Sequence, residues 1–181
     1  MGTTRSTLDD ATVQFILAQR MFFVATAPLD PNGHVNLSPK GLDTLRILDP
    51  ATVVYLDLTG SGVETIAHLK ENGRIVLMFC AFQGPPNILR LYGRGRVIEP
   101  LEPEFEEFKK HFSEFESTRS IIMIELTEIR DSCGYGVPLM KHEGERPHLS
   151  AWARKKGPEG LEAYRCQKNR RSLDGLPGLV E

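Results

Sequence analysis

The sequence predicts a mainly β protein, a mostly antiparallel barrel with helices at its periphery. About six segments have the β-branched, aromatic or alternating patterns of strands, and three or four have helical spacing. The connections between them are mainly short, with neither regular βαβ alternation nor an internal repeat. These three observations favour an antiparallel barrel over a doubly wound sheet.

The N-terminal part of the chain predicts a helix followed by a hairpin. Apolar residues three and four positions apart indicate a helix over residues 7–20, and a strand follows over residues 21–27. Residues 30–33 (Asp-Pro-Asn-Gly) favour a tight turn, because proline presets φ and glycine accepts the left-handed conformation. The chain should return as a strand over residues 34–37, which residues 38–41 interrupt or end.

The central part predicts the order strand, turn, helix, strand. Residues 52–58 are β-branched and aromatic, and the turn at residues 59–62 leads into a helix over residues 63–72 that Gly73 ends. Residues 74–82 are almost continuously apolar, so we expect a strand with both faces covered.

Residues 87–99 alternate between two kinds of side chain. One face carries Leu89, Leu91, Gly93, Gly95 and Val97, and the other carries Arg90, Tyr92, Arg94 and Arg96. Two glycines on one face predict a bulge, a sharp bend of the barrel or the close approach of another group.

The last third begins with a predicted helix over residues 101–115, whose apolar seam has spacings of three and four, and a strand over residues 119–129. We expect residues 1–130 to form the barrel domain. Residues 131–181 should be a loop-rich extension with one helix at about residues 158–169, packed on the barrel or on a partner subunit.

Composition excludes several classes of protein. The 181 residues carry a net charge of −2, which argues against nucleic acid as the main partner, because binding to phosphate backbones requires a positive excess. Three widely spaced cysteines indicate neither a disulfide framework nor a structural zinc site, and the five histidines form no ligand cluster, so no metal is expected. Residues 1–5 have no signal pattern, and the longest apolar run, residues 75–82, is too short to cross a bilayer. We therefore expect a cytoplasmic protein that does not bind membranes.

The turn at residues 59–62 is the first candidate for chemistry. A glycine-containing turn at a helix N-terminus directs free N–H groups outward, and the hydroxyls of Thr59, Ser61 and Thr65 add donors, which together suit a phosphate. However, Ser61 and Glu64 have the spacing of a capping box, which would satisfy the same N–H groups internally. A nearby Glu64 carboxylate would also repel an anion, and taken alone the short motif favours the cap.

Two further candidates carry cations. Lys40 lies between proline and glycine in the segment Asn36-Leu37-Ser38-Pro39-Lys40-Gly41 and would suit a phosphate, although a solvated turn lysine is the commoner role. Arg90, Arg94 and Arg96 need an anion, carboxylate partners or open water, and a charged edge strand facing solvent is the commoner explanation.

In this order and spacing, these segments resemble the pyridoxamine-phosphate-oxidase-like flavoproteins, the FMN-binding split-barrel family. The resemblance runs from about residue 8 to about residue 130. It is carried by Phe22-Phe23-Val24-Ala25-Thr26, the turn at residues 30–33, the segment 36–41, Tyr55-Leu56-Asp57-Leu58-Thr59-Gly60-Ser61-Gly62 and Leu91-Tyr92-Gly93-Arg94-Gly95. It implies a homodimer around a six-stranded antiparallel split barrel with FMN near the subunit interface, and it raises the phosphate interpretation of the turn above the cap.

The resemblance also implies which residues would hold the cofactor. Residues 36–41 would lie along the flavin and its ribityl chain, and residues 59–65 would approach the phosphate with Lys40 helping to neutralise it. The expected cofactor-binding residues are Asn36, Ser38, Lys40, Gly41, Asp57, Thr59, Gly60, Ser61, Gly62 and Thr65, and the expected substrate contacts are Tyr92 and Arg94.

Two features depart from the pyridoxamine phosphate oxidases proper. Those enzymes have basic residues directly after the serine of the phosphate turn, where this chain has Gly62 and Val63, and they end with an Arg/His substrate motif that this tail does not reproduce. We therefore do not expect pyridoxamine phosphate oxidation, and no catalytic residue is assigned. The expected function is an FMN-binding oxidoreductase acting on a small molecule. The alternatives are the same fold with a deazaflavin or haem, or a flavin-binding module without catalysis.

Overall fold

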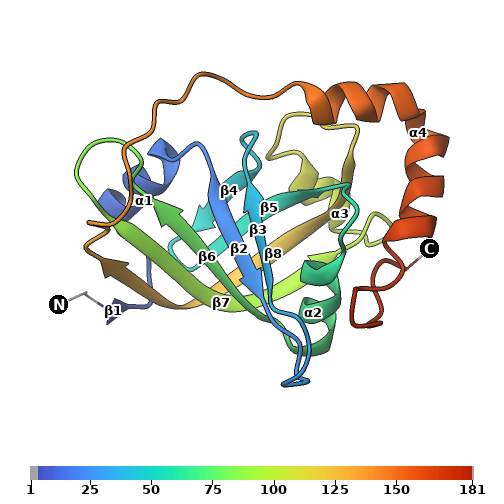
Figure 1. Cartoon of the computed structure of the whole chain (residues 1–181). Coiled ribbons are helices and arrows are strands. Elements are labelled where there is room, and N and C mark those ends of the chain that lie inside the picture. The colour runs from blue at the N-terminus through green and yellow to red at the C-terminus, as the bar shows by residue number, and fades with distance from the viewer. Residues whose placement is uncertain (1–3, 181) are drawn as a thin grey trace.

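An antiparallel sheet forms the body of the protein (Figure 1). The structure is a computed structural model that describes residues 4–180, so Met1 to Thr3 of the polar N-terminus and Glu181 lie outside the described residues. The strands are β1 (Thr4–Arg5), β2 (Phe22–Thr26), β3 (Asn36–Lys40), β4 (Leu45–Asp49), β5 (Thr52–Leu58), β6 (Arg74–Cys80), β7 (Ile88–Ile98) and β8 (Thr118–Ser132). They follow the order β3-β2-β6-β7-β8-β5-β4, and β1 pairs with β8.

Helices lie around this sheet, namely α1 (Asp10–Ala18), α2 (Glu64–Asn72), α3 (Phe105–Lys109) and α4 (His148–Lys168). None of the helices between residues 4 and 180 is both long and apolar enough to span a membrane. The predicted fold class, a mainly antiparallel β protein with peripheral helices, is confirmed.

The strand count is eight rather than six, because two strands have no clear local pattern. β1 has only two residues and pairs with β8 at Thr4–Arg130 and Arg5–Ile129, while Arg46 interrupts the apolar run of β4. β5 has the predicted bounds. β3 continues through Pro39 to Lys40, so the predicted interruption at residue 38 is wrong. Among the described strands β3 pairs only with β2, and an edge strand tolerates proline because one side of its backbone needs no partner.

The helix predicted over residues 101–115 is wrong, since only α3 is helical there and turns flank it. Phe105 and Phe112 are still buried, whereas Leu101 is 83% exposed. α4 begins ten residues earlier than predicted. It contains a kink at Gly157, whose φ of 67° and ψ of 173° are not helical, and Pro158 starts the second helical part.

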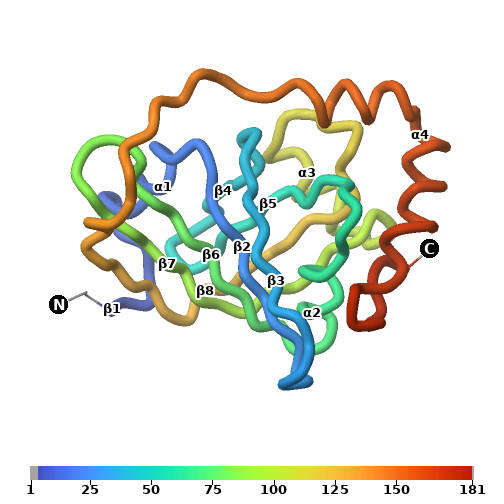
Figure 2. Tube along the Cα trace, viewed as in Figure 1, coloured from blue at the N-terminus to red at the C-terminus, as the bar shows by residue number. Residues whose placement is uncertain are grey.

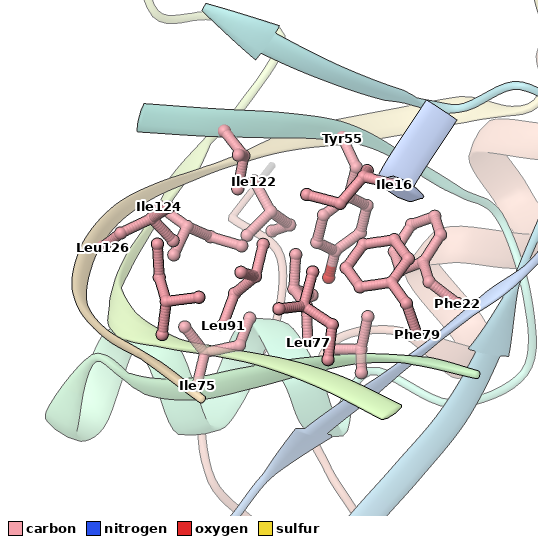
Figure 3. Close-up of a cluster of buried hydrophobic side chains, with 14 of the residues drawn as sticks. Ile16, Phe22, Tyr55, Ile75, Leu77, Phe79, Leu91, Ile122, Ile124 and Leu126 are labelled. Atoms are coloured by element: carbon pink, nitrogen blue, oxygen red, sulfur yellow. The ribbon is translucent and has the colours of Figure 1, made fainter. Parts of the chain in front are cut away.

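Two apolar clusters lie on the two faces of β5 and β8. Val53 and Tyr55 face the larger cluster inside the barrel, where Tyr55 and Phe79 pack against Phe22 (Figure 3). Val54 and Leu56 face the second cluster beneath α3. On β6 one face is buried, with Ile75, Leu77 and Phe79, whereas Val76 and Met78 on the other face are half-buried, so the expectation that both faces are covered holds only in part.

β7 shows two of the three effects that its glycines predict, a bulge and a close approach. The register of β7 against β8 shifts between Tyr92 and Gly93, and a Cβ at Gly95 would lie 2.8 Å from Leu69 Cδ2 of α2. β7 lies between β6 and β8, so the expected edge position of its arginines is wrong. Arg96 instead pairs with Glu104 at 3.0 Å, on the outward face of a central strand.

After β8 the chain crosses the molecule to α4 and then returns toward α2 (Figures 1 and 2). Its final part, residues 169–180, forms a short tail in which Arg171 and Pro177 make a β-bridge. The tail binds α2 and the end of β7, because Lys70 Nζ donates to the carbonyl of Gly178 and Val180 N donates to Glu99 Oε2 at 2.9 Å. The division of the chain at residue 130 stays a prediction.

The bulge on β7 generates a test of the fold. A Cβ at Gly93 would overlap the carbonyl oxygen of Glu125 and lie 2.6 Å from Ile124 Cγ2, and neither can move without disturbing β8. We expect Gly93→Ala to lower the free energy of unfolding by about 1–3 kcal/mol, measured by chemical denaturation. Gly136→Ala is the control, since a Cβ there meets no atom within 4 Å. Equal stability of the two variants would contradict this packing.

Candidate functional site

Asp57, near the end of β5, is the buried centre of the candidate site. Its side chain is fully buried, and its two oxygens accept hydrogen bonds from Lys40 Nζ at 2.9 Å and from Arg119 Nε at 2.8 Å. The carboxylate therefore connects β5 to the edge strand β3 on one side and to the start of β8 on the other.

The charges around Asp57 determine its ionisation. Burial would raise the pKa of Asp57, but the charges of Lys40 and Arg119 and their hydrogen bonds outweigh burial and lower the pKa to about 2. Asp57 is thus ionised at neutral pH. Because one carboxylate faces two cations, this end of the barrel keeps a positive excess.

A second polar group joins β2, β3 and α2. Asn36 Nδ2 donates to Thr65 Oγ1 at 2.9 Å and to Thr26 Oγ1 at 3.1 Å, and Ser38 Oγ donates to Asn36 Oδ1 at 2.9 Å. Thr26 Oγ1 also lies 2.9 Å from His68 Nδ1. Burial lowers the pKa of His68, which favours its neutral form. These bonds fix the inward side chains of β3 against the first turns of α2.

The turn at residues 59–62 is held through its carbonyl groups. Arg119 Nη1 donates to Gly62 O at 2.8 Å and to Gly60 O at 3.3 Å, and Asn169 Nδ2 donates to Gly60 O at 2.9 Å. Thr59 N donates to Ser117 O at 2.7 Å. Since the oxygen and the following N–H of a trans peptide point in opposite directions, the N–H groups after Gly60 and Gly62 point away from Arg119.

The N-terminus of α2 has no side-chain cap. Its N-cap residue is Val63, so the capping box that the spacing of Ser61 and Glu64 favours when taken alone does not form. Within residues 4–180, nothing accepts a hydrogen bond from the N–H groups of Glu64, Thr65 or Ile66. Glu64 instead accepts a hydrogen bond from Leu173 N at 3.2 Å, and its other carboxylate oxygen packs against Gly62.

The structure brings most of the expected cofactor-binding residues to this end of the barrel. Gly41 follows β3 and accepts a hydrogen bond from Thr44 Oγ1 at 2.7 Å. Tyr92 and Arg94 lie elsewhere, on the outward side of β7, where Arg94 Nη1 donates to Asn72 O at 2.8 Å. No described hydrogen bond connects these two residues to the residues around Asp57, and their contact with a substrate stays a prediction.

The sequence analysis missed the residues that support the site from a distance. Arg119, Arg165 and Asn169 all contact residues 57–62, and Thr26 and His68 complete the group around Asn36. Of these residues only Arg119 could have been recognised from the local sequence. It is an arginine at the start of a strongly apolar strand, and such an arginine requires a buried anion. Across residues 4–180, no cluster of three or more His, Cys, Asp or Glu side chains could hold a metal ion.

Comparison with known proteins identifies the class to which this fold and site belong. Residues 8–133 match the model of the pyridoxamine 5'-phosphate oxidase family, and the chain belongs to that family. A particular relative is the pyridoxamine 5'-phosphate oxidase family protein ustO of Aspergillus flavus. The two are 40% identical over 189 aligned positions, which cover 95% of this chain and 76% of that protein.

Solved structures share the fold at low sequence identity. A protein of Lactobacillus delbrueckii provisionally assigned as a pyridoxamine 5'-phosphate oxidase has a TM-score of 0.54 and 17% identity, covering 69% of this chain and 94% of that one. HupZ of group A Streptococcus has a TM-score of 0.53 and 19% identity, covering 67% of this chain and 91% of that one.

The buried carboxylate generates a test of the site. We expect Asp57→Asn to lower the free energy of unfolding at pH 7 by roughly 3–5 kcal/mol, because it leaves Lys40 and Arg119 without their anion. The unfolded-state pKa of 3.8 exceeds the folded-state value of about 2. The wild-type contribution, on the order of 2 kcal/mol, is therefore complete above pH 3.8 and lost as the pH falls toward 2.

Denaturation at several pH values measures both effects. Asp57→Asn should lack the part of the acid-induced loss that arises in this window. Asp10→Asn, at the exposed first turn of α1, is the control and should keep the wild-type profile. A wild-type acid profile in Asp57→Asn would show that Asp57 is not the depressed group.

Proposed function

We propose that the protein is an FMN-dependent oxidoreductase that passes hydride or electrons between the flavin and a small molecule, as a cytoplasmic homodimer. Family membership supports a flavin, and the observation that carries the proposal is the uncapped N-terminus of α2 beside the turn at residues 59–62. Its free N–H groups and the helix dipole suit a phosphate. Three thiols, Cys80, Cys133 and Cys166, are unpaired, which suits a reducing compartment.

The residues present fit the cofactor at both of its ends. The free N–H groups after Gly60 and Gly62 and at Thr65 would hold the phosphate, with the positive excess around Asp57 behind them. Asn36 and Ser38 on β3 offer amide and hydroxyl groups to the ribityl chain and the ring. The bound flavin would supply the redox chemistry, and the chain would bind and orient it.

One carboxylate opposes this binding. Glu64 packs against Gly62, beside the N–H groups that would hold the phosphate. A phosphate there must displace or tolerate this side chain, which is half-buried and bonded only to Leu173 N among the residues that the structure describes. Pyridoxamine phosphate oxidation itself is not proposed, because Gly62 and Val63 stand where that activity is associated with basic residues.

The edge strand β3 supports the homodimer. Val35, which precedes β3, is 74% exposed and Leu37 within it is 63% exposed, and both point to the outward side of a strand with one unpaired edge. An apolar strip beside the candidate cofactor residues is suited to a second copy of the chain.

The absorption spectrum of the purified protein, recorded before and after addition of FMN and desalting, tests the cofactor. We expect retained FMN with its two visible bands. A colourless protein that retains no FMN would favour a deazaflavin, and a Soret band would favour haem. Reduction of the bound flavin by NADH or NADPH with turnover supports an enzyme, and resistance to both nicotinamides supports a binding module.

The effect of the Glu64 charge at the phosphate position is tested in the same assay. Glu64→Gln removes the opposing charge while keeping an oxygen for Leu173 N, so we expect FMN to bind about fivefold more tightly, roughly 1 kcal/mol. Riboflavin, which lacks the phosphate, should bind as it does to the wild type. Glu71→Gln, at the other end of α2, is the matched control. Equal effects on FMN and riboflavin would place the phosphate elsewhere.

The dimer is tested separately by sedimentation. We expect the wild type to sediment as a dimer at micromolar concentration and Leu37→Glu to sediment as a monomer, because the charge would have to be buried in the interface. Leu139→Glu, at a 79% exposed position in the segment after β8, should remain dimeric. A monomeric wild type would contradict a flavin site built at the interface.

A further inference from the structure

A cavity of about 910 Å³ lies between α4 and the chain segment that runs from the end of β7 to the start of β8. Its apolar walls include Phe105 and Phe115 from one side and Leu161 from α4. This volume is within the range of small-molecule sites, which are commonly apolar clefts with a few polar groups. The kink at Gly157 opens directly onto it, because Gly157 and Pro158 are both in its lining.

The cavity lining includes Arg165, which has no anionic partner among residues 4–180. Arg165 is half-buried, and it donates to Thr59 Oγ1 at 3.0 Å and to Thr118 O at 3.1 Å, which are both neutral acceptors. Within the described part of the chain, no carboxylate oxygen lies within 4.0 Å of its guanidinium. Burial lowers the pKa of Arg165, and the nearby charge of Arg119 lowers it further.

Four glutamates also line the cavity, Glu99, Glu106, Glu116 and Glu162, but among the described residues none of them forms an ion pair with Arg165, and Glu99 and Glu106 pair with Lys70 and Lys109. Arg119 also lines the cavity, but Asp57 is its anion and is shared with Lys40. Lys40 and Arg119 thus share the one carboxylate of Asp57, and Arg165 takes no part in that contact. Glu162 lies on the cavity wall one helical turn before Arg165, and its charge acts on Arg165 without forming an ion pair within 4.0 Å in the described part of the chain.

We propose that this cavity binds an organic anion with an apolar or aromatic body, whose anionic group pairs with Arg165 and whose body lies between Leu161 and the phenylalanines. This site is separate from the proposed phosphate position. The carbonyls of the turn at residues 59–62 face the arginine side, whereas its free N–H groups face the opposite side. The proposal therefore does not depend on flavin binding.

Cys166 provides the test, because it lines the cavity, whereas Cys133 is exposed elsewhere. The probe is 8-anilinonaphthalene-1-sulfonate, an aromatic body with one sulfonate. Alkylation of the full chain by iodoacetamide is followed at each cysteine by peptide mass spectrometry. We expect the probe to slow alkylation of Cys166 at least fivefold and to leave the rate at Cys133 unchanged.

Three variants test the role of charge. Arg165→Gln should abolish the protection of Cys166, and Glu162→Gln should reach the same protection at lower probe concentration, because it removes a competing negative charge. Lys155→Gln removes a positive charge from an exposed position of α4 outside the cavity lining and should behave as the wild type. The Arg165 and Glu162 variants are expected to change the protection of Cys166 in opposite directions, so the test stays valid even if one variant loses stability.

Four results would overturn the proposal. They are no protection of Cys166, equal slowing at Cys133, a Cys166 that is unreactive in the free protein because a second copy covers it, and protection by FMN in place of the probe. The last result would assign the cavity to the flavin, whereas failure to bind FMN with Cys166 still protected would refute only the proposed cofactor.

Discussion

The site depends on one carboxylate that has no access to water. Asp57 is held between Lys40 and Arg119, and these two contacts fix the edge strand β3 and the beginning of β8 relative to β5. Burying such a group costs solvation energy that its two cationic partners must offset, and the same two contacts fix the geometry of the strands. Arg119 extends the effect, because the same guanidinium that meets Asp57 also holds the carbonyls of Gly60 and Gly62.

That arrangement gives the turn at residues 59–62 two chemically different sides. Its oxygens are engaged by Arg119 and Asn169, while its N–H groups remain free on the side of α2. A turn without these partners would rotate its peptides freely and present a mixture of donors and acceptors. The C-terminal helix is therefore part of the site's support, although no residue beyond 130 was expected to contribute to it.

How much of the fold and of the candidate site could be predicted depends on how far apart in the sequence the interacting residues lie. β5 was predictable from its β-branched and aromatic residues and β7 from its alternation, because both signals are local, and the glycines of β7 were correctly expected to mark a bulge or a close approach. The capping box was misleading because Ser61 and Glu64 have the right spacing, but Leu173, 109 residues away, binds the carboxylate. The spacing of the phenylalanines in residues 101–115 was likewise misleading. It predicted one long helix, but the segment consists of turns around the short helix α3. Contacts such as Arg165 with Thr59 leave no periodic signal at all.

The distance between these partners also determines when the site can form. Asn169 and Gly60 are separated by 109 residues. The ribosome synthesises the chain from the N-terminus toward the C-terminus, so the turn leaves the ribosome long before the side chains that orient it. Contacts of such high sequence separation also make folding slow. The barrel strands can pair while synthesis continues, but the oriented turn is completed only after Asn169 has left the ribosome.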